Sequence, residues 1–482
     1  MPGARAHTPH AVATAADGLK RTLTLRDLIV YGLLFIAPMA PVGVFGALDA
    51  KSHGVVPLVY VVATVAMAFT AYSYTRMVRA VPQAGSVYAY ARTGLGEGAG
   101  FVAGWMAMLD YLLIPAVGYL FSGIAMNQLV PSVDQWIWTA AAVVITTALN
   151  LSGVRRAAAV GFVVLALEIV VLLVFVVAAL VVLAQHGPAR GWLSPFTGDQ
   201  DFSLVAVLSA VSVAVLSFLG FDAIANFAEE TVSGKDRQGG KDGAEKGRGG
   251  SSVVAKALLG CLLLAGVLFL AQTYLAALLS PDSSRDLARD PAAQGSAFYV
   301  AVESAVGGWL QTTVAASKAV GAAFAALAGQ AAAGRLLYAM ARDRRLPRAL
   351  SKVDAGTGAP RRTLLLTAVI TLCAAVWAAR TPDGLDRLVS VVDIGALTAF
   401  ALLHLSVIGY YGVRKRDGAA GVLRDWVLPL AGLAITVAVI VTAHRDAHLV
   451  GLAWLAAALV ILAVLRARKV TPGSGAGGGA GQ

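Results

Sequence analysis

Repeated apolar runs of about 20 residues or more are the feature that most constrains how this 482-residue chain can fold. An α-helix needs about 20 apolar residues to cross the ~30 Å hydrocarbon core of a bilayer. A soluble core instead favours helices with a single apolar stripe. Only 13% of the residues are charged, about half the share of a typical soluble domain, and they gather between the runs. The chain is therefore predicted to be an all-α polytopic membrane protein.

Twelve runs are long enough to be membrane spans. They cover residues 28–51, 55–76, 98–129, 135–153, 159–184, 203–231, 254–279, 310–341, 362–380, 386–411, 424–443 and 448–466. With this division, about 30 of the 38 Lys and Arg residues lie on the side of the two termini, which the positive-inside rule makes the cytoplasmic side. The net charge of +11 thus reflects topology in the cell membrane, and no nucleic-acid partner is expected.

Two of the spans contain residues that interrupt a helix. The first has Pro38, Pro41 and Gly43 near its middle, and the sixth has Gly220 two residues before Asp222. Such residues free backbone groups that lipid cannot satisfy, and a break of this kind is tolerated where it lines a cavity. An ordinary kink would explain either span alone. Interrupted helices at matching positions of two five-helix halves favour a transporter with inverted repeats and a substrate site at the breaks. The substrate-binding candidates at the breaks are Pro41, Val42, Gly43 and Gly220.

The rest of the chain divides around these spans. Spans one to ten form a predicted core over residues 25–411, with repeats at about 25–185 and 203–411. Spans eleven and twelve occupy 424–466. The segments expected to be disordered in the cytoplasm are polar, basic or rich in glycine, and comprise residues 1–24, 234–252 and 467–482.

Ionisable side chains inside the membrane are costly, by about 2.5–3.5 kcal/mol each, and are functional candidates for that reason. Counting ~1.5 Å per residue from the nearest loop places Asp110 about 18 Å deep, and Glu168 and His404 about 14–15 Å deep. Asp222 follows the break in span six. The same count places Lys318 and Asp393 near the outer interface, where a lysine can snorkel to water.

Each of the four deep residues has a possible structural role as well as a functional one. Asp222 can pair with a substrate ammonium and carry a proton, or can cap the second half of span six. Asp110 either faces the same cavity or bonds a neighbouring helix. Glu168 either carries a proton or caps a polar seam. His404 titrates near neutral pH in isolation, but a lone histidine in a helix is more often a packing residue.

Several motifs resemble the amino acid–polyamine–organocation superfamily. They occur in the family's order, as VPQAGSVYAYAR (Val81 to Arg92), SFLGFDAIANFAEE (Ser217 to Glu230) and GRLLYAMARDRRLP (Gly334 to Pro347), and the resemblance covers residues 25–465. Within the superfamily, GWMAMLDYLLIP (Gly104 to Pro115), FLGFDA and VVDIGALTAF are most similar to the bacterial putrescine importers.

The resemblance implies a leucine-transporter-like fold with helices 1 and 6 broken. It places Asp222 at the family's gating acid, Tyr111 at an inner-gate tyrosine, and Tyr119, Phe218 and Phe221 among the substrate-contacting aromatics. Glu168 stands where many relatives have a lysine that substitutes for a bound sodium ion.

Two positions depart from the putrescine importers. Gly43 stands where they carry an aspartate, which leaves mono-amines and amino acids open as substrates. Asp393 stands where they carry an amide.

The predicted function is a proton-coupled secondary transporter that imports small amines or amino acids by alternating access, with a putrescine-like polyamine as the first substrate candidate. An amino acid permease or an amine/amino acid exchanger is the alternative within this class, and a channel is the alternative outside it. The chain shows no clustered catalytic set, so no enzyme activity is expected. Its two cysteines, Cys261 and Cys373, cannot build a metal site, and no cofactor is expected.

Overall fold

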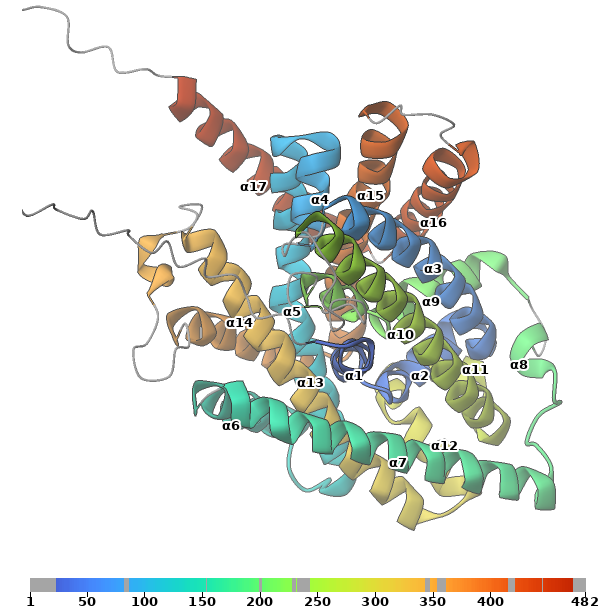
Figure 1. Cartoon of the computed structure of the whole chain (residues 1–482). Coiled ribbons are helices and arrows are strands. Elements are labelled where there is room, and N and C mark those ends of the chain that lie inside the picture. Colours follow the sequence, from blue (N-terminus) through green and yellow to red (C-terminus); the bar gives the residue numbers. More distant parts are fainter. Residues whose placement is uncertain are drawn as a thin grey trace, which may run out of the picture.

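The computed structural model describes residues 23–81, 86–152, 154–198, 202–227, 231, 243–342, 347–352, 361–414, 421–443 and 445–470. Among these residues the secondary structure is helical, apart from one isolated bridge between Leu23 and Thr231. The helices pack into a single bundle (Figure 1). Ten of the twelve predicted spans correspond to the long helices α3 (Val56–Ala80), α5 (Glu97–Leu129), α6 (Gln135–Ser152), α7 (Val154–His186), α10 (Gly243–Leu279), α13 (Gly308–Arg342), α14 (Arg361–Ala379), α15 (Gly384–Val407), α16 (Leu428–Thr442) and α17 (Arg445–Val470).

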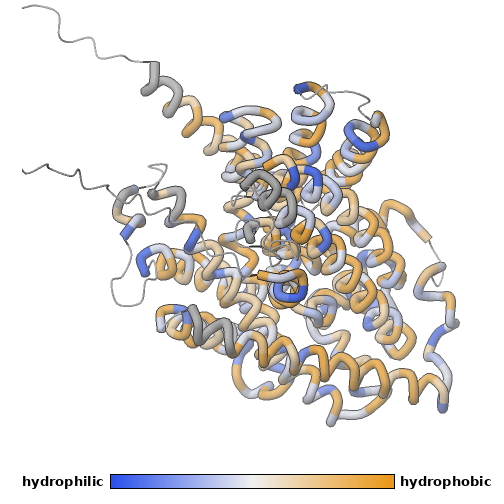
Figure 2. The backbone as a smooth tube through the Cα atoms, viewed as in Figure 1, coloured by the Kyte–Doolittle hydropathy of each residue, from blue (hydrophilic) through white to orange (hydrophobic). Residues whose placement is uncertain are grey.

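The length and apolarity of these helices suit a membrane. Within the described residues, nine helices are long and apolar enough to span one, and a bent helix pair at the N-terminal end makes a tenth. Figure 2 colours most residues of the outer helices as hydrophobic, and many apolar side chains are well exposed, as those of Val163 and Val267 are. In a membrane these side chains face lipid. The multi-pass helical fold is thus confirmed, whereas the count of twelve spans and the inverted repeat stay predictions.

The first predicted break is present. Helix α1 (Leu25–Ile36) begins with a capping box between Thr24 and Asp27, and ends at Ala37 with a φ of 60°. Helix α2 (Ala40–Ser52) then starts with Pro41 in its first turn, at an angle of 48° to α1. Proline suits a first helical turn because its missing N–H has no intrahelical partner there.

The second predicted break is also present. Helix α9 (Leu204–Leu216) ends before a turn, and the short 3₁₀ helix η1 (Phe221–Phe227) follows it. Gly220 lies in the turn with a φ of +105°, which side chains with a Cβ rarely adopt. The composition of the two spans therefore predicted both interruptions correctly.

Short helices connect the spans. They are α4 (Ser86–Leu95), α8 (Ser194–Thr197), α11 (Ser284–Arg289), η3 (Ala293–Gly295), α12 (Ala297–Ala305), η4 (Arg348–Ser351), and the π-helical η5 (Ile408–Arg414) and η6 (Leu423–Val427). In the centre of the bundle α5 packs along both α13 and α15. Of the segment expected to be disordered at 234–252, residues 243–252 form the start of α10. Residues 234–242, the termini 1–22 and 471–482, and Glu229 and Glu230 lie outside the described residues.

Candidate functional site

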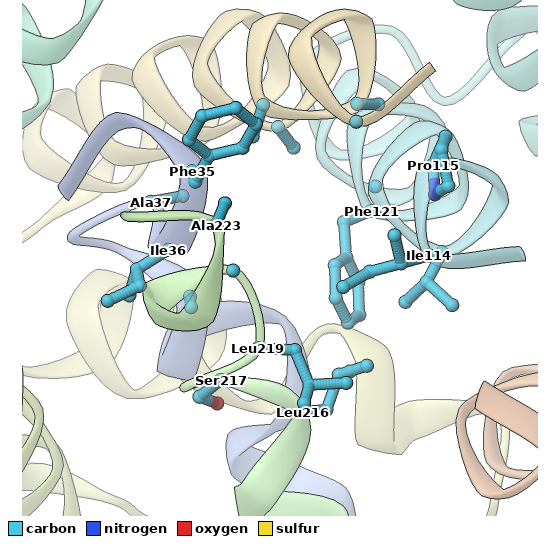
Figure 3. A pocket seen from close by; sticks show the side chains of 18 of the residues that line it. Phe35, Ile36, Ala37, Ile114, Pro115, Phe121, Leu216, Ser217, Leu219 and Ala223 are labelled. Atoms are coloured by element: carbon cyan, nitrogen blue, oxygen red, sulfur yellow. The ribbon is translucent and has the colours of Figure 1, made fainter. Parts of the chain in front are cut away.

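A cavity lies where the two broken spans meet α5 and α13. It encloses about 820 Å³ of empty space, counting the space at its mouth, and most of its lining is apolar. Figure 3 shows Phe35, Ala37 and Ala223, from the broken spans, across the cavity from Ile114 and Phe121 of α5. The polar side chains among its lining residues are Asp110, Tyr111, Ser217, Asp222 and Lys318.

The two breaks touch each other beside this cavity. A Cβ built on Gly220 would lie 3.0 Å from the Cβ of Phe35 and 3.2 Å from its carbonyl carbon. Gly220 thus serves two purposes, because it supplies the positive φ and allows the close approach to α1.

Asp222 begins the second half of the sixth span and lines the cavity. Its Oδ2 accepts hydrogen bonds from the hydroxyls of Tyr74 on α3 (3.3 Å) and Tyr111 on α5 (3.4 Å). Backbone N–H groups of Gly220 and Asp222 also donate to the carboxylate. Asp222 thus lies beside the break as predicted, and its carboxylate is held by α3, α5 and the turn at Gly220.

An aromatic cluster packs around Tyr74. Its ring makes edge-to-face contacts with Tyr90, Phe221 and Phe400, at centroid separations of 5.9 to 6.1 Å. All four rings are buried. The four rings therefore form a closely packed aromatic cluster beside Asp222, which accepts a hydrogen bond from Tyr74.

Asp110 also lines the cavity, beside Tyr111 on α5. It is 9% exposed, and its Oδ1 has no hydrogen-bond partner among the described residues. The charge of Asp110 interacts with that of Asp222. Of its two predicted alternatives, the structure has the cavity-facing one, so two carboxyl groups border one cavity.

The position predicted for Lys318 was wrong. The count of residues along α13 placed it at the outer interface, yet it is only 2% exposed and lines the cavity. Its Nζ donates a 3.0 Å hydrogen bond to the carbonyl of Met39 in the first break, and lies 5.1 Å from the ring centroid of Phe121. The axial count failed because the side chain reaches sideways to the broken helix rather than along its own axis to water.

Gln272 on α10 completes the support of the first break. Its Nε2 donates a 3.0 Å hydrogen bond to the carbonyl of Pro38. The two carbonyls of the Pro38–Met39 turn are therefore each satisfied by a side chain from a different helix, as a break inside a membrane protein requires.

Glu168 on α7 lies behind this region and does not line the cavity. It is 2% exposed, and its carboxylate packs against Gly321 on α13, one turn after Lys318. The charges of Glu168 and Lys318 interact with each other. The acid and the buried lysine thus bring opposite charges close to the first break, although no ion pair within 4.0 Å joins the two described side chains.

Asp393 is a second correction. It was expected near the outer rim, but it is 1% exposed and lies nine residues into α15. Helix α15 packs against α5, α16 and α17. Counting residues along the helix axis does not reveal burial by neighbouring helices.

The other predicted residues are buried close to the site without lining it. Gly43 packs so tightly that a Cβ would lie 2.6 Å from the ring of Phe121. The hydroxyl of Tyr119 accepts a 2.8 Å bond from Thr146 on α6. The predicted site residues outside the cavity lining are Pro41, Val42, Gly43, Tyr119, Phe218, Phe221, Glu168 and His404.

His404 has a local network of its own. Its Nδ1 lies 2.8 Å from the hydroxyl of Ser73 and its Nε2 3.4 Å from that of Thr70, both on α3. Its ring also packs against Gly432 on α16. This placement matches the packing interpretation, which the sequence analysis favoured.

Sequence reasoning missed one complete wall of the cavity. Helix α13 presents a face of small residues there, comprising Ala322, Ala325, Ala326, Gly329 and Ala332. Their spacing of three and four residues places them on one helix face. In the sequence, such a face of small residues indicates either close helix packing or a cavity.

Comparison with known proteins agrees with this arrangement. The profile of a family described as "Amino acid permease" matches residues 28–465, which contain every residue that lines the cavity. The chain belongs to the amino acid permease family. It is 31% identical over 460 residues to the low-affinity putrescine importer PlaP of Escherichia coli, covering 93% of this chain and 94% of that protein.

Other relatives in the family have different substrates in their names. The branched-chain amino acid permease BcaP of Lactococcus lactis is 28% identical, with 83% of each chain covered. The methylthioribose transporter of Bacillus subtilis is 25% identical, with 82% of each chain covered. Membership of the amino acid permease family makes this protein a multi-pass membrane transporter of amines or amino acids, and not an enzyme. The described residues contain no group of three or more His, Cys, Asp or Glu residues that could hold a metal ion.

Proposed function

We propose that this protein imports small amines into the cytoplasm together with protons, with a diamine such as putrescine as the first candidate, and that it works by alternating access in the cell membrane with both termini inside. The observation that carries this proposal is the pair of carboxyl groups, Asp110 and Asp222, that borders one mostly apolar cavity. The relative named as a putrescine importer supports the substrate class.

The two acids have different surroundings and so suit different partners. Asp222 is held by two tyrosine hydroxyls and by backbone N–H groups, which orient it to meet an ammonium at the break. Asp110 has an unpartnered oxygen within the described structure and can accept a hydrogen bond from a second ammonium. In an apolar cavity a charge-assisted hydrogen bond contributes about 1.5–3 kcal/mol. An aspartate at position 43, as in the putrescine importers, would meet the ring of Phe121, so Asp110 is our candidate for the second acid.

The buried lysine supports protons rather than sodium as the coupling ion. Lys318 supplies a positive charge at the carbonyl of Met39, where an oxygen ligand of a metal cation would otherwise be free. Glu168 balances this charge from α7. We assign Lys318 a structural role as a built-in cation and Glu168 the role of its counter-charge. We assign the transported proton to the acids of the cavity.

The experiment for this proposal is uptake by the purified protein in liposomes. Radiolabelled putrescine, spermidine, a mono-amine, lysine and leucine are each offered with an inward proton gradient, with an inward sodium gradient, or with neither. Saturable putrescine uptake that needs the proton gradient supports the proposal. Uptake that persists without it but requires sodium overturns the coupling, and flux that does not saturate with concentration favours a channel.

An amino acid permease or exchanger is the second candidate, and a specific observation favours it. Lys318 lines the same cavity as the two acids, so a zwitterion could place its carboxylate toward Lys318 and its ammonium toward Asp222. The same uptake panel separates the two, because this alternative predicts that leucine or lysine competes with putrescine or replaces it. Preloading the liposomes with unlabelled substrate distinguishes exchange from net import, since only an exchanger requires it.

A further inference from the structure

Ser86 is a buried polar residue that the proposed function does not use. It is the first residue of α4, which packs against η1. Its hydroxyl donates a 3.3 Å hydrogen bond to the hydroxyl oxygen of Tyr74 on α3. Tyr74 in turn donates to Oδ2 of Asp222, also over 3.3 Å. A chain of hydrogen bonds thus runs from α4 through Tyr74 to the break in the sixth span.

The order of donors in this chain decides where the proton of Tyr74 points. A phenol hydroxyl carries one proton and can donate it to one acceptor at a time. Because Ser86 donates to the oxygen of Tyr74, that oxygen acts as an acceptor toward α4 and its own proton is directed to the carboxylate. Hydrogen bonds in a buried chain also strengthen one another. Ser86 therefore favours the orientation in which Tyr74 donates to Asp222.

A second residue of α4 holds the ring of Tyr74. Tyr90 follows Ser86 by four residues, so the two side chains lie on the same face of α4. The ring of Tyr90 meets that of Tyr74 edge to face, with 6.1 Å between the ring centroids. One short helix thus contacts Tyr74 at its hydroxyl and at its ring. Of these two contacts, only the one from Ser86 orients the hydroxyl proton.

The backbone of Ser86 adopts a conformation that glycine would adopt more easily. Its φ is +44°, a region that is uncommon for residues with a Cβ. Strain of this kind costs stability and is found most often at functional sites. Glycine would relieve the strain at this position, but it could not supply the hydroxyl that Tyr74 accepts.

We propose that Ser86 is a positioning residue for the substrate site, which acts through Tyr74 to fix the carboxylate of Asp222 for a substrate ammonium. An ionised carboxylate can accept about four hydrogen bonds. Fixing Oδ2 determines where its remaining acceptor positions point. A group that is already fixed loses less conformational freedom on binding, which raises the affinity for the ligand. The inference rests on the proposed contact between Asp222 and the substrate.

Two substitutions at position 86 separate the effect of the hydroxyl from that of the backbone. Ser86→Ala removes the hydroxyl and keeps the strained φ, whereas Ser86→Gly removes the hydroxyl and relieves the strain. Purified Ser86→Gly should therefore unfold at a higher temperature than Ser86→Ala. Both should bind radiolabelled putrescine about two- to tenfold more weakly than the wild type, as the loss of one hydrogen bond predicts. A serine that only caps α4 would change stability and leave the affinity unchanged.

Tyr74→Phe tests whether Ser86 acts through Tyr74. This variant lacks the bridging hydroxyl, so its affinity for putrescine should fall at least as much as that of Ser86→Ala. Adding Ser86→Ala to Tyr74→Phe should cause no further loss, because the chain is already broken. Thr93→Val is the matched control, since Thr93 also lies on α4 and its hydroxyl bonds the carbonyl of Ala89 within that helix. This control should bind putrescine as the wild type does.

Uptake by the same proteins in liposomes gives the second measurement. Ser86→Ala should raise the KM for putrescine by about two- to tenfold and keep the maximal rate within about twofold of the wild type, because the lost interaction contributes to substrate binding. If the wild type takes up lysine rather than putrescine, the proposed substrate is wrong, and the same comparisons with lysine test Ser86, since lysine also presents an ammonium to Asp222.

Asp222→Asn keeps a failure of this inference apart from a failure of the proposed function. Wild-type affinity in Asp222→Asn would remove the proposed substrate contact and the inference with it. Reduced affinity in Asp222→Asn, with wild-type affinity in both Ser86 variants, would leave the proposed site standing and overturn the inference. A further loss when Ser86→Ala is added to Tyr74→Phe would also overturn it, because Ser86 would then act by a route other than Tyr74.

Discussion

Replacing Lys318 with methionine should destabilise the protein through the charge that it leaves behind. Lys318→Met keeps a long flexible side chain but removes the hydrogen bond to the carbonyl of Met39 and the charge opposite Glu168. A hydrogen bond from a charged group contributes about 1.5–3 kcal/mol, and removing one partner of a buried ion pair costs about 3–5 kcal/mol. These costs overlap, because both include the ammonium, and Lys318 and Glu168 make no direct ion pair, so we expect a loss of about 3 kcal/mol, where the two ranges meet.

A double variant isolates the contribution of the pair. Lys318→Met combined with Glu168→Gln leaves no unbalanced buried charge, and replacing a whole buried pair is often nearly neutral. The double variant should therefore be more stable than Lys318→Met alone, although it contains one more substitution. Both midpoints of thermal unfolding are measured on purified, substrate-free protein in the same detergent.

The interaction energy between Lys318 and Glu168 is calculated from the stabilities of the wild type, the two single variants and the double variant. A positive coupling of more than about 1 kcal/mol would agree with a paired lysine and glutamate, since independent sites add within about 0.3–0.5 kcal/mol. Additive losses from the two substitutions would refute the reasoning, because they would show that the two charges do not compensate each other.

Three further predictions concern the break, the topology and the coupling ion. Gly220→Ala should lower the unfolding midpoint and the transport rate, because a Cβ there meets Phe35 and a side chain at a φ of +105° is strained by about 1–3 kcal/mol. The control Gly308→Ala, with open space around it, should change neither. A Gly220→Ala variant with wild-type stability and transport would contradict the account of the break. A reporter fused after Arg468 should be active only in the cytoplasm, and activity on the outer side would reverse the proposed orientation. A protonophore should abolish concentrative uptake whereas withdrawal of sodium should not, and the opposite pattern would reject proton coupling.

The spans and the breaks could be predicted from the sequence because both are local properties. Apolar runs of sufficient length have few alternatives to a spanning helix. The turn at Pro38 and Pro41 and the one at Gly220 follow from backbone chemistry at single residues, and both are present. Asp222 was identified from its place next to a break, and it does line the cavity.

The companions of Asp222 were harder to predict because they depend on which face of a helix is covered. Depth along the axis predicted an interior position for Asp110, which is buried, yet it failed for Lys318 and Asp393, which neighbouring helices also bury. Among the aromatics, Phe121 reaches the cavity and Tyr119, two residues earlier, does not. Residues two apart on a helix point in nearly opposite directions, and sequence spacing alone does not tell which direction is inward.

Putrescine uptake by Asp222→Asn in liposomes, with wild-type protein beside it, tests the central claim most directly. Asparagine keeps the size of the side chain and can still accept a hydrogen bond from Tyr74 or Tyr111, but it removes the charge that meets the ammonium. Loss of one charge-assisted hydrogen bond costs about 1.5–3 kcal/mol, so the affinity for putrescine should fall about 10- to 150-fold. The variant should reach the membrane at the wild-type level, and a diamine should lose more affinity than an amino acid. Transport of all substrates with wild-type affinity by Asp222→Asn would contradict the account, since Asp222 would then only cap the helix.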